Sequence, residues 1–413
     1  MSVARPVSVE TLASIPWMSA KSLSHAMREV SLRGPNDEQT WTHLVSRADV
    51  IAPSFNPKQA ALMMNSLARI TIETEGPVEL FIRRYLRRFL SQIIPDCSPL
   101  DLAQVVHAIG AFNRHHDCVS SNLVQEIDSA LTQQIPRMDD RELCMTASGL
   151  AIADSLGSRE VLRTLVDAST KSGNQLSDRT LAQVLHLAGI RGHACETLVA
   201  HELTRRIPAM NHRSLVLSLN AISRLGIRNN AVLSVLSETI MSPDSQLVAI
   251  PFHQLTLLLR ALQKLGMNTS DPLALHRIMD SLIRSDFTNQ TTSALCAFVN
   301  SASRLSGYSH VIRECLGILV DRSLQPDEAI LLIQSVCRMG DVDSEIIKLL
   351  LSKGEFGIPE LARICKALDR IPSIRDPEIA SSLKRHFRNL PKDCGKDADV
   401  EFIATVLDKF QSV

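Results

Sequence analysis

Hydrophobic residues along this chain recur with a period near 3.6 rather than 2. In the stretches 78–94, 120–135 and 196–207, apolar residues fall at i, i+3, i+4 and i+7, which places them on one face of an α-helix. No sustained strand-like alternation between turn residues is found in the sequence. The pattern therefore predicts an all-α protein built from amphipathic helices.

The helical pattern is itself repeated. Residues 102–107 read LAQVVH and residues 181–186 read LAQVLH, each inside a capped apolar helix that ends in a form like LxALxxLG and precedes an amphipathic partner helix. Equivalent positions lie 32 to 42 residues apart, at Ala60, Leu102, Leu143, Leu181, Leu215, Leu255, Leu295, Ala329, Leu361 and Val400. One helix pair cannot bury its apolar face alone, whereas stacked pairs share a continuous core. We therefore expect a right-handed α-solenoid of about ten helix-pair repeats of 32–42 residues.

Helix-ending and helix-starting residues fit these pairs. First helices end at glycines, which can close a helix in the left-handed conformation, namely Gly157, Gly226, Gly266 and Gly340. Second helices end before prolines, which cannot continue the hydrogen-bond ladder, at Ile94-Pro95, Ile135-Pro136, Ile207-Pro208 and Leu390-Pro391. The expected capping residues are Ser98, Asp139, Ser177 and Asn211.

The repeats suggest three parts of the chain. Residues 1–55 are predicted to form an N-terminal extension with a degenerate cap repeat, residues 56–390 the helix-pair array, and residues 391–413 a capping helix. The stretches 34–56 and 240–252 are predicted to be longer inter-repeat loops.

Composition narrows the function classes. Of the 413 residues 45% are hydrophobic, enough for a continuous core, and only 4% are aromatic, which is few for a base-stacking RNA module. The 44 Lys and Arg balance the 44 Asp and Glu, so a strongly basic nucleic-acid coat is excluded and any RNA surface must be local.

The cysteines and the N-terminal residues give indications of the cellular compartment of the protein. Nine scattered cysteines without a CxxC pair indicate free thiols in a reducing compartment rather than disulfides or a zinc site. No apolar run is long enough to predict a membrane span. The first 34 residues form a weak organellar transit signal, with a plain soluble N-terminus as the alternative. They combine serines with Arg5, Lys21, Arg28 and Arg33, but also with Glu10 and Glu29.

Catalytic chemistry is not indicated. The sequence contains no phosphate-binding GxxxxGK[ST] loop, GxGxxG, HExxH or GxSxG. His115-His116 is read as an exposed polar turn rather than a metal site, because adjacent turn residues rarely converge on one ion. His107 and His186 share one repeat position and are expected to have a structural role. We therefore expect a non-enzymatic protein without metal, cofactor or small-molecule substrate.

Basic residues on second helices are the candidate binding sites. Arg83, Arg84, Arg87 and Arg88 share one face of the helix 78–94, and arginine's planar fork suits phosphate oxygens. No acidic residue lies between them, so the face is expected to meet nucleic acid or an acidic partner; a solvated face, or one paired with a neighbouring unit, is the alternative. Weaker candidates late in other second helices are Arg205, Arg206, Lys384, Arg385 and Arg388.

The repeat unit resembles a known group of proteins. LAQVVHAIGAF (102–112) and LSLNAISRLG (217–226) are similar to repeats of organellar RNA-binding proteins, namely the octotricopeptide and heptatricopeptide class and the helical part of FAST-kinase-like and RAP-domain proteins. The resemblance covers roughly residues 56–410 and implies an RNA-associated role in mitochondria or plastids. No RAP-like module with mixed strands follows the array, so the resemblance implies a scaffold without nuclease activity.

Two functions remain open from sequence. The first is a scaffold associated with organellar RNA, as a structural component or assembly factor of a mitochondrial ribosome or RNA-processing complex. Its partners would be rRNA or other mitochondrial RNA and proteins of a large assembly, in the mitochondrial matrix. The second is a HEAT- or armadillo-like protein adaptor without direct RNA contact. A cytoplasmic location is the alternative to the mitochondrial one. Neither function requires a membrane.

Overall fold

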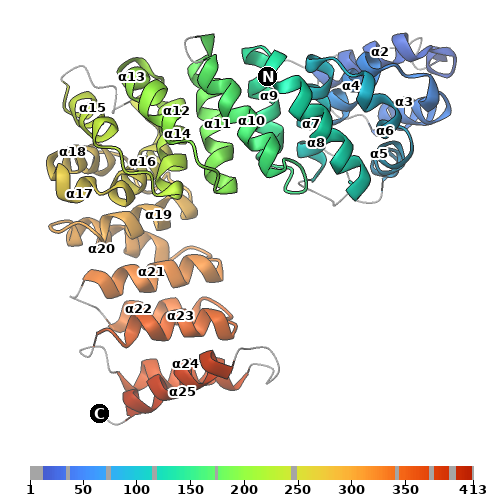
Figure 1. Cartoon of the computed structure of the whole chain (residues 1–413). Coiled ribbons are helices and arrows are strands. Elements are labelled where there is room, and N and C mark those ends of the chain that lie inside the picture. The colour runs from blue at the N-terminus through green and yellow to red at the C-terminus, as the bar shows by residue number, and fades with distance from the viewer. Residues whose placement is uncertain are drawn as a thin grey trace. The chain divides into compact units, whose positions relative to one another are not determined.

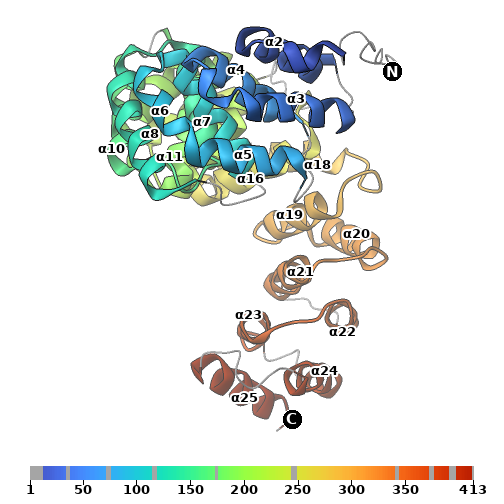
Figure 2. The same ribbon diagram turned by 90° about the vertical axis from the view of Figure 1, so that its right-hand side faces the viewer.

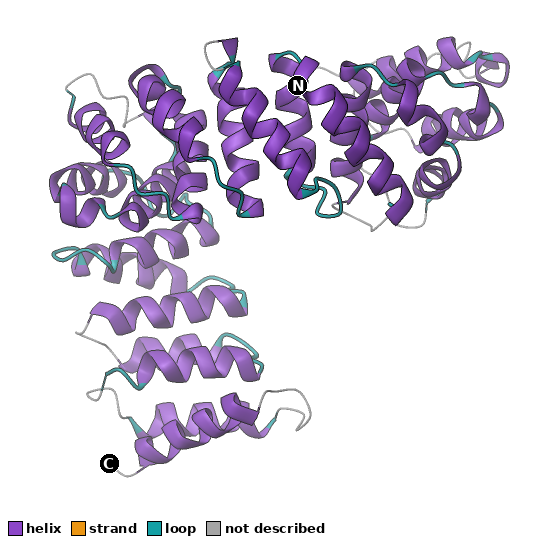
Figure 3. Ribbon diagram, in the orientation of Figure 1, coloured by secondary structure: helices purple, strands orange, loops and turns teal. Residues whose placement is uncertain are grey.

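The computed structural model describes an all-α chain. It describes residues 13–33, 38–70, 76–113, 119–172, 175–242, 249–339, 344–371, 376–389 and 397–411. Within these ranges every regular element is a helix (Figure 3). The chain divides into two compact units, Met1–Leu236 (the N-terminal unit) and Ser237–Val413 (the C-terminal unit). The predicted all-α class of stacked helix-pair repeats is confirmed.

The N-terminal unit has two layers of helices (Figure 1). In the first layer each helix packs on the next, in the order α2 (Ala20–Arg33), α4 (Pro57–Leu67), α7 (Pro99–Asn113), α9 (Asp140–Leu150), α11 (Asp178–Arg191) and α14 (His212–Leu225). The second layer contains α3 (Glu38–Val50), α5 (Pro77–Arg88), α6 (Leu90–Ile93), α8 (Ser121–Gln134), α10 (Arg159–Lys171), α12 (Glu196–Leu198), the π-helix η6 (Val199–Leu203) and α13 (Thr204–Arg206). The core lies between the layers, where Leu, Ile, Val and Ala side chains are almost fully buried.

The C-terminal unit repeats this organisation. Figure 2 shows its first helices in one column and most of its second helices in another. The first helices are α16 (Phe252–Leu265), α19 (Thr292–Ala302), α21 (Pro326–Met339), α23 (Ile358–Leu368) and α25 (Asp397–Gln411). The others are α17 (Met267–Ser270), α18 (Pro272–Ile283), α20 (Ser309–Val320), α22 (Ser344–Ser352) and α24 (Pro377–Arg388). The remaining helix, α15 (Asn230–Met241), contains the division between the units.

Helix ends follow the predicted chemistry. Gly226 and Gly266 close α14 and α16 with φ of 69° and 94°, the left-handed conformation expected of helix-closing glycines. The expectation for Gly157 is wrong: its φ is 86°, but α9 already ends at Leu150, with Ala151 as a right-handed C-cap. Gly340 lies outside the described residues. The predicted caps accept hydrogen bonds from the third following amide, at Ser98, Asp139, Ser177 and Asn211. Three short 3₁₀ helices, η3 (Ile94–Asp96), η4 (Ile135–Arg137) and η7 (Ile207–Ala209), end second helices at the predicted Ile-Pro pairs. Leu390-Pro391 falls outside the described part.

The predicted loop 34–56 is wrong for residues 38–50. Helix α3 occupies Glu38–Val50 and buries Trp41, Leu44, Val45 and Ala48, which have the i, i+3, i+4, i+7 spacing of an apolar stripe. This helix packs on α5, while its partner α2 packs on α4, so α2 and α3 form a further helix pair. Most of the other predicted loop, 240–252, lies outside the described residues. The three-part division of the chain at residues 55 and 390 stays a prediction.

Close backbone contact joins α7 to α9. A Cβ atom at Gly149 would lie 2.6 Å from the Val106 carbonyl oxygen and 2.8 Å from the His107 Cα, and neither backbone atom can move without shifting its helix. We therefore expect Gly149→Ala to lower the free energy of unfolding by about 1–3 kcal/mol, measured by urea denaturation. Gly317→Ala in α20 is the control: its Cβ would meet no atom within 4 Å, so it should stabilise by about 0.5–1 kcal/mol. Equal effects of the two changes would contradict the close approach.

Candidate nucleic-acid interface

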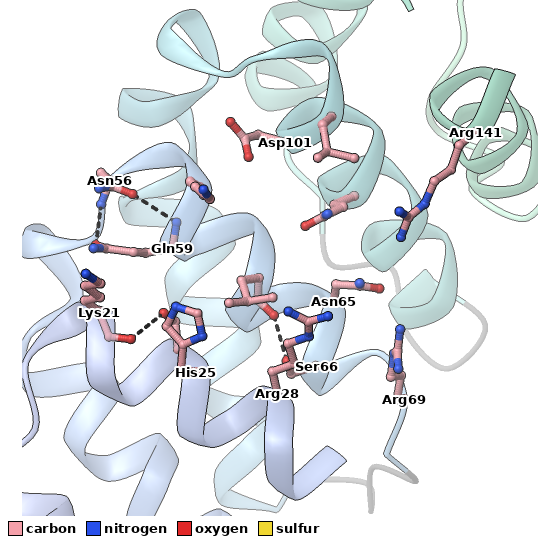
Figure 4. Close-up of a pocket in the computed structure, with 15 residues that line it drawn as sticks. Lys21, His25, Arg28, Asn56, Gln59, Asn65, Ser66, Arg69, Asp101 and Arg141 are labelled. Carbon is pink, nitrogen blue, oxygen red and sulfur yellow. Dashed lines mark hydrogen bonds between the residues drawn. The ribbon is translucent and has the colours of Figure 1, made fainter. Parts of the chain in front are cut away.

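The first layer of the N-terminal unit contains a basic hollow. It lies across α2, α4, α7 and α9 and has a volume of about 540 Å³ (Figure 4). It is lined by Lys21, Ser24, His25, Arg28, Asn56, Lys58, Gln59, Leu62, Asn65, Ser66, Arg69, Leu100, Asp101, Gln104 and Arg141. The lining therefore includes five Lys or Arg side chains and a single carboxylate.

Helical spacing puts these cations on one face. On α2, Lys21, His25 and Arg28 follow at i, i+4 and i+7, while Leu23 and Met27 turn into the core with 0% exposure. On α4, Lys58 shares its face with Leu62 and Asn65 and with Arg69, just beyond the helix. Figure 4 shows Arg28, Arg69 and Arg141 arriving from three different segments.

The one acidic residue does not neutralise the hollow. Asp101 is 9% exposed, and its Oδ2 accepts hydrogen bonds from the Ser98 hydroxyl at 2.6 Å and the Ser98 amide at 3.2 Å. This carboxylate is therefore held in the helix cap of α7. The five cations are exposed, and none forms an ion pair with any residue that the structure describes: Lys21, Arg28, Lys58, Arg69 and Arg141. Such a site can bind several phosphate groups of one polyanion.

The predicted arginine face on α5 is partly neutralised. Arg83 donates to Glu79 at 2.6 Å, and Arg84 contacts Asp49 of α3. The expectation that no acidic residue neutralises this face is therefore wrong for two of its four arginines. Glu79 lies one turn earlier on the same helix, and Asp49 belongs to the segment that was predicted to be a loop. Arg87 and Arg88 are exposed and have no ion pair within the described ranges. RNA contact by this face stays a prediction.

The second candidate, Arg205 and Arg206, is largely occupied within the repeat. Both donate to Glu202, at 2.8 and 3.2 Å, and Arg206 also reaches Asp178 and the Leu176 carbonyl. Burial alone would raise the pKa of Glu202, but the hydrogen bonds from Arg205 and Arg206 lower it below its usual value. The Arg206 side chain is only 12% exposed and holds the start of α11 through Asp178, whereas the Arg205 side chain is 55% exposed.

The third candidate lies on α24 in the C-terminal unit. Arg385 and Arg388 are exposed, and Lys384 is half-buried. Arg385 has a long hydrogen bond of 3.5 Å to the Ser382 hydroxyl of its own helix. These residues belong to a different unit from the hollow, and their contact with RNA stays a prediction.

The histidines and cysteines that the structure describes form no metal site. His107 and His186 are half-buried on α7 and α11, and burial, with Arg224 nearby, lowers the pKa of His186. Burial raises the pKa of six thiols to about 12, at Cys97, Cys195, Cys296, Cys315, Cys337 and Cys365. Across the described ranges no group of three His, Cys, Asp or Glu residues is placed to hold a metal ion. His115, His116, Cys118 and Cys394 lie outside those ranges.

The hollow was missed in the sequence because its cations are not clustered along one helix. A search for basic runs finds Arg83–Arg88, whereas Lys21, Lys58 and Arg141 lie on three different helices and are 37 and 83 residues apart. The signal appears when repeats are aligned, since each of these residues immediately follows the first residue of its helix. Within the described part of the chain, no helix has the length and apolar character that a membrane span requires.

Comparison with known proteins shows likeness of structure only. No family model matches this chain, and no curated protein matches it. Yeast Rmd9p, solved in complex with a 16-nucleotide target RNA, is similar with a TM-score of 0.40 and 11% identity over 94% of this chain and 84% of that chain. A homology model of the full-length AP-3 complex gives 0.37 and 10%, over 98% and 86%. A circular tandem repeat protein gives 0.28 and 14%, over 98% and 97%.

Proposed function

We propose that this protein is a non-catalytic helical-repeat scaffold that binds RNA through the basic hollow of its N-terminal unit. The supporting observation is the five exposed cations that α2, α4 and α9 bring around one hollow, without ion pairs among the described residues. Elsewhere in the unit, arginines such as Arg83, Arg84 and Arg206 meet acidic partners. In the hollow the positive charge is left for a ligand, and phosphate is the anion that RNA presents at every nucleotide.

The cellular setting is part of the proposal. We place the protein in the mitochondrial matrix, as a structural component or assembly factor of a mitochondrial ribosome or RNA-processing complex. The resemblance of the repeats to organellar RNA-binding proteins supports this setting. Zero net charge suits a protein that binds RNA locally and packs against proteins elsewhere.

The salt dependence of RNA binding in vitro should show whether the cations of the hollow contact phosphate. Each phosphate contact with single-stranded RNA contributes about 0.7 to the slope of log affinity against log salt. The triple variant Lys58→Gln, Arg69→Gln, Arg141→Gln should therefore bind single-stranded RNA more weakly and lower the slope by about 2. Fluorescence anisotropy over a salt series measures both quantities.

A matched control has the same change in charge. Arg137, Arg159 and Lys171 are also exposed, have no ion pair with a described residue, and belong to η4 and α10. The corresponding Gln triple should leave the slope as in the wild type. If the hollow variant has the RNA affinity and the salt slope of the wild type, the hollow is not the RNA site.

Purification from the native cell tests the proposed mitochondrial, RNA-containing assembly. Tagged protein, isolated with and without nuclease and analysed by mass spectrometry and RNA sequencing, should bring down mitochondrial RNA and proteins that depend on it. A nuclease-resistant protein set without RNA would instead identify a HEAT- or armadillo-like adaptor and overturn the proposal.

A further inference from the structure

A row of cations runs beyond the hollow along the first layer of the N-terminal unit. Five of its six helices carry Lys or Arg as their second residue, and α7 carries Leu100 there. The cations are Lys21, Lys58, Arg141, Arg179 and Arg213. The six helices pack consecutively, so these residues follow one edge of the layer, from α2 to α14. All five are exposed and have no ion pair within the described residues.

This placement opposes the local preference of a helix. The N-terminus of an α-helix carries a partial positive charge, so the first turn favours Asp or Glu and disfavours Lys or Arg. The acidic side chains of these first turns are already bound: Asp101 to Ser98, Asp140 to Ser177, and Asp178 to Arg206. Asp139 and Glu142 form a reciprocal capping box. Among the described residues, therefore, no ion pair explains these cations.

The C-terminal unit provides an internal contrast. The second residues of its first helices are His253, Ser293, Asp327, Pro359 and Ala398. A Lys or Arg is present in the last turn of α16, α21, α23 and α25, where the helix dipole favours it. The row is therefore not a general property of the repeat.

Half-buried polar side chains follow the row along the middle of the same helices. They lie four or seven residues after the cation position, on the same face of each helix, and include Asn65, Gln104, Ser148, Gln183, His186 and Asn220. Asn65 and Gln104 line the hollow together with the cations. Amide, hydroxyl and imidazole groups donate and accept hydrogen bonds, as the edges of unpaired bases require.

We propose that the row is a phosphate track that guides one single strand of RNA across α2 to α14, with its bases over the mid-helix polar side chains. This inference rests on the proposed RNA function and extends it to Arg179 and Arg213, which lie outside the hollow. A single row fits the backbone of one strand, and the polar side chains beside it can bind only bases that are not already paired. The hollow is the α2–α9 end of this track.

The double variant Arg179→Gln, Arg213→Gln in the full chain tests the track. On an unstructured single-stranded RNA of 20 or more nucleotides, we expect weaker binding and a salt slope lower by about 1.4 than in the wild type. The control Arg159→Gln, Lys171→Gln on α10 should bind as the wild type does. The melting temperature should rise in the test variant, because two cations leave helix N-termini, so weaker binding would not reflect unfolding.

The outcomes separate the two proposals. If the Arg179/Arg213 variant binds as the wild type while the Lys58/Arg69/Arg141 variant is impaired, the track is overturned and RNA binding at the hollow stands. Equal competition by fully paired duplex RNA would also overturn the track. If neither variant changes RNA binding, the track and the hollow fail together.

Discussion

Replacing Arg191 with Met lowers the free energy of unfolding of the N-terminal unit by about 3 kcal/mol, the largest single-residue effect that we expect. The guanidinium of Arg191, on α11, donates to four carbonyl oxygens where α9 ends: Leu150 at 3.0 Å, Ala153 at 2.6 Å, Asp154 at 2.9 Å and Leu156 at 3.2 Å. The last carbonyls of a helix have no partner within the helix. Arg191 satisfies that of Leu150, the last residue of α9, and three carbonyls of the turn that follows, with a side chain that is only 18% exposed.

Two further variants test whether the lost hydrogen bonds of Arg191 cause this loss of stability. Arg191→Lys should recover only part of the stability, because one ammonium cannot spread its donors over four carbonyls as a planar guanidinium does. Arg179→Met changes an exposed cation on the same helix that has no ion pair with a described residue, and it should not destabilise. Urea denaturation of the three variants measures the differences. An Arg191→Met protein as stable as the wild type would show that water satisfies these carbonyls equally well.

The same role recurs at other places in the array and explains why arginine content is a poor guide to RNA binding here. Arg47 donates to the Met18 carbonyl, Arg277 to those of Met241 and Ser242, and Arg322 to that of Gln290. These side chains fasten one segment of the chain to another by completing its backbone hydrogen bonds. A cation becomes a candidate for RNA only when such a contact is absent, as it is at Lys58 and Arg141 of the hollow among the residues that the structure describes.

The fold could be predicted from the sequence because its signals are local. Apolar spacing, capping residues such as Asp139 and closing glycines such as Gly226 are each decided within a few residues, and all agree. Helix α3 was missed although Trp41, Leu44, Val45 and Ala48 have helical spacing, because the segment does not follow the LxALxxLG template. Missing α3 also hid Asp49 as the partner of Arg84.

The candidate site could be predicted only in part because it depends on residues from different repeats. Four arginines on α5 form a conspicuous pattern, but whether each is free depends on tertiary contacts with Glu79 and Asp49. The cations at the hollow and along the track are single residues in the sequence. They become a surface only when neighbouring helices are packed in the same register. Aligning the repeats by helix start, rather than by apolar residues, would have shown this row.

Removing all five track cations should make the protein more stable while it loses RNA. We expect the variant with Gln in place of Lys21, Lys58, Arg141, Arg179 and Arg213 to gain about 0.3–1 kcal/mol per residue, or roughly 1.5–5 kcal/mol in total, since each cation opposes a helix dipole. Thermal denaturation at low salt measures the gain, which high salt should reduce by screening.

The control lies on one of the same helices. Arg224 is exposed in the last turn of α14, where the dipole favours it, so Arg224→Gln should destabilise, whereas Arg213→Gln at the other end should stabilise. A five-residue variant less stable than the wild type would show that these cations support the fold. Their alignment would then need no ligand to explain it. A more stable variant that no longer binds RNA would mean that the N-terminal unit keeps these charges, at a cost in stability, for its polyanionic partner.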